Sequence, residues 1–102
     1  MGLTIQLEAE GGRVLDTIED PKNVLRGVLP GPDAEEFPYV RYVDPYGDTI
    51  FNRLQMSLFL REWDMLARRA SSAEAEALVG KVRRLAERCA REEHCYLRFI
   101  GD

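Results

Sequence analysis

Alternation of apolar and polar residues predicts short β-strands over residues 3–8, 13–18, 39–43, 49–51 and 95–100. Gly11-Gly12 lies between the first two stretches, and paired glycines suit the tight turn of an antiparallel hairpin. The third and fourth stretches flank the turn sequence DPYGD, in which Pro45 fixes φ and Gly47 can adopt a left-handed conformation. We therefore expect two hairpins within residues 3–51.

Apolar residues spaced three and four apart predict two long helices, over residues 53–70 and 72–93. Each helix is expected to begin at a capping-box pattern, Asn52–Gln55 for the first and Ser71–Glu74 for the second. The connection between the two helices is very short, so they should pack against each other as an antiparallel pair.

A shorter helix is predicted over residues 21–29, because Asp20 suits a helix N-cap and Pro21 suits the first helical position. The predicted order of elements is β-β-α-β-β-α-α-β, in a single domain of residues 1–102. Short hairpins combined with helices indicate an α+β fold. We expect a small antiparallel sheet of four or five strands, with the two-helix antiparallel hairpin packed on one face.

The composition is that of a globular protein, with 45% apolar and 31% charged residues in a chain of 102. No apolar run approaches the ~18 residues of a membrane span, and the N-terminus lacks the pattern of a signal peptide. Cys89 and Cys95 are therefore expected to be reduced thiols in the cytoplasm. The net charge is −4, with ten acids against four bases in residues 1–50. Such a chain is a poor match for nucleic acid, which needs clustered lysine and arginine.

The residues that could carry catalysis are few, and His94 is the one histidine. It lies at an expected helix end, where histidine commonly bonds terminal carbonyl groups, and zinc would need a further ligand beside Cys89 and Cys95. Asp44 and Asp48 flank one turn and could share acid and base roles, although aspartate there ordinarily caps the turn itself. One alternative function is therefore a small-molecule-binding or hydrolytic domain using Asp44, Asp48 and His94. No metal and no cofactor is predicted.

Three large apolar residues of the first long helix lie off its apolar stripe: Leu54, Leu58 and Met65. A helix that is apolar on two sides is either buried on both or paired with something outside its own chain. This pattern supports another alternative, in which the protein is the subunit of a structural homodimer.

Tyrosines and acids gather around the turn at residues 44–48 and predict a contact surface made of Tyr39, Tyr42, Asp44, Tyr46, Asp48 and Arg53. Tyrosine offers a large contact area at a low entropic cost, which suits recognition of another protein. Our main interpretation is a small cytoplasmic protein-binding domain without enzymatic activity, which acts as an inhibitor, an immunity-like protein or an adaptor. Small acidic α+β bacterial proteins that neutralise a toxin are similar to this chain in size and charge alone.

Overall fold

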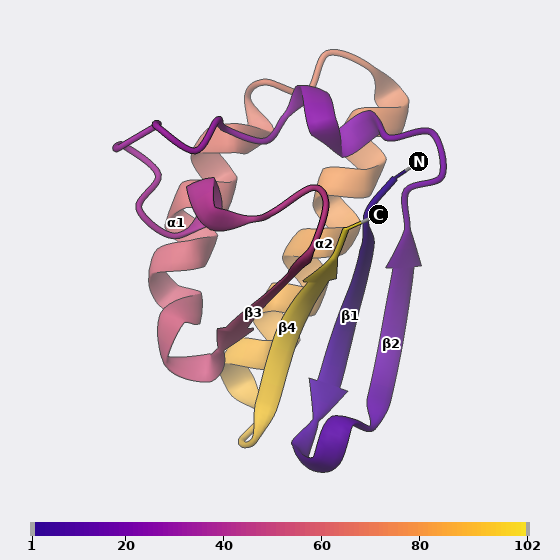
Figure 1. The fold of residues 1–102 in the computed structure, drawn as a ribbon, viewed down its shortest axis with the longest axis vertical. Coiled ribbons are helices and arrows are strands. Elements are labelled where there is room, and N and C mark those ends of the chain that lie inside the picture. The colour runs from indigo at the N-terminus through magenta and orange to yellow at the C-terminus, as the bar shows by residue number, and fades with distance from the viewer. Residues whose placement is uncertain (1, 102) are drawn as a thin grey trace.

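A four-stranded antiparallel sheet carries two helices on one face in the computed structural model, which describes residues 2–101 (Figure 1). The strands are β1 (Thr4–Ala9), β2 (Val14–Glu19), β3 (Asp48–Asn52) and β4 (Cys95–Ile100), and the helices are α1 (Met56–Ala67) and α2 (Ala73–Arg91). Short 3₁₀ turns lie at Glu10–Gly12, Val24–Gly27, Val40–Tyr42 and Arg53–Gln55. The predicted α+β fold, with both long helices on one face of an antiparallel sheet, is confirmed.

The spatial order of the strands is β2-β1-β4-β3, so the last strand of the sequence lies inside the sheet. β4 pairs antiparallel with both β1 and β3, and the register places Leu7, Leu97 and Phe51 in one row across the sheet. All three side chains are buried under the helices. Because side chains alternate between the faces of a strand, Arg98 and Ile100 of β4 lie on the open face.

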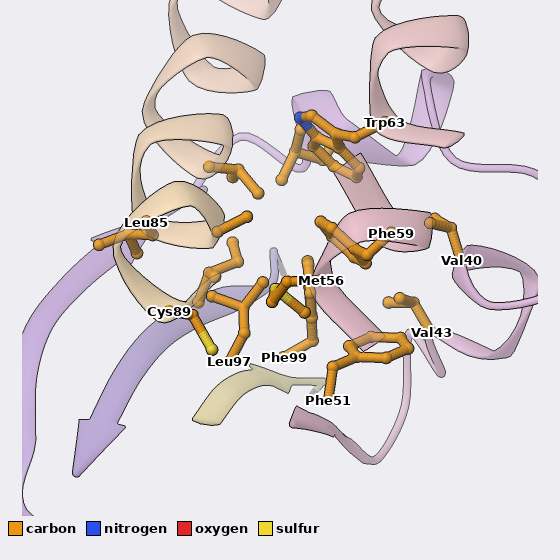
Figure 2. Close-up of a cluster of buried hydrophobic side chains, with 14 of the residues drawn as sticks. Val40, Val43, Phe51, Met56, Phe59, Trp63, Leu85, Cys89, Leu97 and Phe99 are labelled. Atoms are coloured by element: carbon orange, nitrogen blue, oxygen red, sulfur yellow. The ribbon is translucent and has the colours of Figure 1, made fainter. Parts of the chain in front are cut away.

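An aromatic cluster joins the helices to the sheet (Figure 2). Phe59 and Trp63 of α1 stack with their ring centroids 5.5 Å apart and an interplanar angle of 12°. Phe51 of β3 and Phe99 of β4 approach the Phe59 ring at centroid distances of 5.1 and 5.9 Å. The Trp63 Nε1–H also donates a hydrogen bond of 3.0 Å to the Val79 carbonyl, which fastens α1 to α2.

The predicted strand over residues 39–43 is wrong, because this segment contains the 3₁₀ turn Val40–Tyr42. The backbone N–H groups of Tyr39 and Val40 donate to the carboxylate of Glu62 on α1, at 3.1 and 2.9 Å. The Val43 N–H bonds the Val40 carbonyl, so these two valines share one buried side of the turn. The second hairpin is consequently absent from the described residues 2–101, and β3 pairs with β4 alone.

The short helix predicted over residues 21–29 is reduced to the 3₁₀ turn Val24–Gly27. Asp20 does cap this turn, but its two carboxylate oxygens accept the N–H groups of Val24 and Leu25, both at 2.8 Å. The intervening Asn23 adopts a left-handed conformation with φ of 57°. Asp20 is itself buried, so its hydrogen bonds attach the start of the Val24–Gly27 turn to the interior of the protein.

The long helices begin close to their predicted starts. Asn52 and Gln55 form the predicted capping box at the turn that leads into α1. The cap of α2 is Ser72, whose hydroxyl accepts the Ala75 N–H at 3.0 Å, one residue later than the predicted box at Ser71. Within residues 2–101, no helix is both long and apolar enough to span a membrane.

Candidate functional site

A surface groove of about 540 Å³ separates the segment that follows the Val24–Gly27 turn from the turn that leads into β3. One wall comes from Arg26 and residues 29–32, and the other from residues 41–46. In Figure 1 both segments lie at the end of the sheet where β3 begins. We call this feature the Tyr/Arg groove; its lining residues are Arg26, Leu29, Pro30, Gly31, Pro32, Arg41, Tyr42, Val43, Asp44, Pro45 and Tyr46.

Each exposed tyrosine of the groove is held by an arginine. The Arg26 guanidinium lies 5.3 Å from the Tyr46 ring centroid, and its Nη2 donates to the Tyr46 hydroxyl at 2.9 Å. Arg41 makes the same two contacts with Tyr42. Its guanidinium lies 4.8 Å from the ring centroid, and its Nη2 donates to the hydroxyl at 2.8 Å. Tyr46 and Tyr42 are 69% and 60% exposed, so these contacts fix two rings that otherwise project into solvent.

The turn beneath the tyrosines is fixed by its own hydrogen bonds. The Asp44 carboxylate accepts the Tyr46 N–H at 2.8 Å, and the Asp44 N–H donates to the Thr49 hydroxyl at 3.0 Å. From the C-terminal side, the Gly101 N–H donates to the Gly47 carbonyl at 2.7 Å. Asp44 therefore stabilises the turn through its side chain, and the turn presents Tyr46 in one defined position.

The predicted contact surface is divided among several places. Tyr39 is half-buried and packs against the core. Asp48 lies on the open face of the sheet, where its carboxylate is 3.5 Å from the Arg98 guanidinium. Arg53 lines a separate depression together with His94, at the opposite end of β4. The groove brings together three of the six predicted residues: Tyr42, Asp44 and Tyr46.

The three residues of the hydrolytic alternative do not form one site. His94 precedes β4, has a left-handed φ of 60°, and places its Nδ1 3.8 Å from the Glu10 carboxylate. Asp48 pairs with Ile100 at the other end of the same strand. At ~3.3 Å per residue, β4 separates His94 from Asp48 by roughly 15–20 Å. Among residues 2–101, no group of three His, Cys, Asp or Glu side chains is placed to hold a metal ion.

Comparisons with protein-family models, curated proteins and solved structures find no match. The function must therefore be argued from the geometry of the groove. That geometry places two guanidinium groups, two phenol rings and several apolar side chains on one open surface.

The sequence interpretation missed Arg26, Arg41 and the proline segment Pro30–Pro32 as site residues. Arg41 stands next to Tyr42, so an arginine–tyrosine neighbour pair was a local signal that could have identified it. Arg26 is twenty residues from Tyr46, as the hydrogen bond between them records. No local pattern could have linked those two, because their contact depends on how the intervening loop folds back.

The two cysteines are buried and unpaired, in contrast to what nucleophilic chemistry would need. Burial, together with the nearby Cys95 and Glu92, raises the pKa of the Cys89 thiol to about 12. Burial and a hydrogen bond to the Glu92 carboxylate also raise the pKa of Cys95. Both thiols are therefore protonated at neutral pH, and the uncharged form is the one that a buried position favours.

The raised pKa of Cys89 predicts a loss of stability in alkali. Above about pH 9 the unfolded thiol releases its proton while the folded thiol keeps it, so the free energy of unfolding falls as pH rises. The expected slope is up to about 1.4 kcal/mol per pH unit for this group. Urea denaturation of the wild type and of Cys89→Ala, followed from about pH 8 to about pH 10.5, isolates this contribution from other titrating groups. A stability difference that stays constant over this range would contradict the assignment.

Proposed function

We propose that the protein is a cytoplasmic protein-binding domain, of the inhibitor or adaptor kind, which contacts another protein through the Tyr/Arg groove. The observation that carries this proposal is that an arginine contacts the ring and the hydroxyl of each of Tyr42 and Tyr46, while both rings remain largely exposed. Tyrosine and arginine are the residue types that most often dominate binding energy at protein interfaces.

Rigidity supports binding because ordering flexible side chains on association costs about 0.5–1.5 kcal/mol for each one. In the Tyr/Arg groove this ordering is already present in the free protein, through the ring contacts of Arg26 and Arg41 and through the Asp44 cap. The wall opposite the tyrosines is apolar, with Leu29, Pro30 and Pro32. This arrangement supports the proposal because interface cores combine aromatic anchors with apolar side chains in the same way.

Binding is favoured over catalysis by the groups that line the groove. None of its described lining residues is a histidine, cysteine, serine or lysine. Its one carboxylate, Asp44, already accepts a backbone hydrogen bond from Tyr46. The arginines serve as charged anchors for a ligand.

Replacing both Tyr42 and Tyr46 by alanine should weaken partner binding about thirtyfold or more, because two central aromatic anchors are lost. The melting temperature should change little, since both side chains are exposed. The test is affinity purification of the tagged chain from cells that naturally contain it, followed by reconstitution with the purified partner and titration calorimetry.

Tyr96→Ala is the matched control, because Tyr96 is an exposed tyrosine on the open face of the sheet, away from the groove. It should bind the partner as the wild type does. Equal partner affinities of the double variant and the wild type would contradict the proposal. If Tyr96→Ala lost as much affinity as the double variant, the interface would have to include the open face of the sheet.

A homodimer is the second candidate, and it is favoured by a separate observation. Leu54, Leu58 and Met65 are all exposed on the outer side of the first long helix and the turn before it, with Leu54 77% exposed. A second copy that covers these side chains would remove apolar surface from water. Sedimentation equilibrium of the wild-type chain measures whether two copies associate.

A further inference from the structure

The two arginines of the groove are held in position but carry no ion-pair partner among residues 2–101. Arginines elsewhere in the fold are neutralised by acids: Arg83 by Asp64, Arg88 by Asp16 and Arg98 by Glu8. Other arginines also lack an acid, and Arg69 packs against the Phe37 ring. Arg26 and Arg41 differ because each also donates a hydrogen bond to the hydroxyl of the tyrosine that it packs against. Their positive charge is therefore both fixed and free to act on a ligand.

Each guanidinium has five N–H donors, and a neighbouring tyrosine uses one of them. The Nε of Arg41 is buried, so the donors left for a ligand are the remaining N–H groups of its terminal Nη atoms. A carboxylate can accept two parallel hydrogen bonds from such a fork, and a fork that is already ordered loses less entropy on binding. The groove therefore supplies unused donors that match a carboxylate.

The other lining residues indicate which groups should flank the acidic group of the ligand. Leu29, Pro30 and Val43 also line the groove and add apolar side chains to it. Asp44 is the one acid among the described lining residues, and it would repel a second carboxylate placed near the turn. The acids of residues 33–36 follow the proline wall in the chain but do not line the groove. A ligand with one acidic group flanked by apolar groups matches this distribution.

We infer that the Tyr/Arg groove binds an extended peptide segment of its partner, in which an aspartate or glutamate between apolar residues pairs with Arg26 and Arg41. This inference rests on the proposed function and names its partner more closely. A nucleic acid fits less well, because two arginines on a chain of net charge −4 release few counterions. Proline and tyrosine surfaces suit an extended backbone, as in other grooves that recognise such segments.

The test is selection of short random peptides displayed on phage against the immobilised full-length chain. Enriched peptides should contain aspartate or glutamate far more often than the starting library. A synthetic enriched peptide should bind the wild type in fluorescence polarisation, and its amide counterpart, with Asp→Asn or Glu→Gln, should bind about tenfold or more weakly.

Arg26→Gln and Arg41→Gln should each weaken the acidic peptide about tenfold or more, while Arg26→Lys and Arg41→Lys should lose less because they keep the charge. Arg84→Gln is the matched control, since Arg84 is exposed on α2 and does not line the groove. Thermal melts followed by circular dichroism confirm that each variant folds.

The outcomes separate this inference from the proposed function. Peptides that lose binding to the Tyr42→Ala/Tyr46→Ala variant but show no preference for acids, and no dependence on the arginines, would overturn the inference alone. Peptides whose binding ignores both the tyrosines and the arginines would overturn the groove as a docking site. Acid-rich peptides that depend on Arg26 and Arg41 would support both.

Discussion

Replacing Trp63 by alanine is expected to lower the free energy of unfolding by about 3–5 kcal/mol, the range for removing a large buried aromatic side chain. Trp63 is fully buried, stacks on Phe59, and lies 6.3 Å from the Phe99 ring between centroids. Its removal would open a cavity where α1, α2 and the sheet meet. It would also leave the Val79 carbonyl without its indole donor.

Urea denaturation followed by far-ultraviolet circular dichroism measures this loss, because the variant has no tryptophan left for fluorescence. Trp63→Phe keeps an aromatic ring and should cost about 1–3 kcal/mol, mainly through the unsatisfied carbonyl and a smaller cavity. Leu54→Ala is the control at an exposed position and should change stability by about 0.5 kcal/mol or less. A cost below about 1 kcal/mol for Trp63→Ala would contradict this account of the core.

The long helices and the strands at both ends of the chain could be predicted because their patterns are local. The stripe that contains Phe59 and Trp63 is buried as its spacing predicts, and the Asn52–Gln55 box forms as written in the sequence. The alternation of Leu3, Ile5 and Leu7 also places these residues in the core.

The segment at residues 39–43 was mispredicted because its alternation and β-branched content resemble those of a strand. The decisive partner is Glu62, which is distant in the sequence and lies on the polar side of its helix pattern. Glu8 shows the same effect on a smaller scale. Strand alternation alone would turn Glu8 toward solvent, but it is buried beside Arg98 of β4, with 3.4 Å between the charged groups.

The candidate site was only half predictable for the same reason. The turn chemistry of Asp44 and Gly47 marked the region, and the tyrosines beside it were visible in the sequence. The groove itself needs Arg26 and the proline wall, which reach it through loop packing. No periodicity specifies such packing, since loop conformation depends on contacts with the rest of the fold.

Glu62 should be the polar residue on which this loop packing depends most. Its side chain is 5% exposed, and its carboxylate accepts the backbone N–H groups of Tyr39 and Val40. Glu62→Ala would leave both donors unpaired in a region where water is largely excluded. Each buried donor without a partner costs about 1–3 kcal/mol, so we expect the free energy of unfolding to fall by about 2–5 kcal/mol.

Glu62→Gln separates the hydrogen bonds from the charge. The amide oxygen can still accept, so the expected loss is smaller, about 1–2 kcal/mol, because hydrogen bonds to a charged acceptor are the stronger kind. Glu36→Ala, at an exposed loop position, is the control and should have little effect.

Amide hydrogen exchange locates the effect of Glu62→Ala within the fold. The amides of Tyr39 and Val40 should lose protection first, because the carboxylate is their acceptor, whereas amides of β4 should keep theirs at low denaturant concentration. Since the Val40–Tyr42 turn carries Arg41 and Tyr42 to the groove, the same variant should also bind a groove-dependent peptide more weakly than Glu36→Ala does. Unchanged protection at Tyr39 and Val40 would show that the Val40–Tyr42 turn keeps its conformation without the contact to α1. The shape of the groove would then depend on its own lining residues.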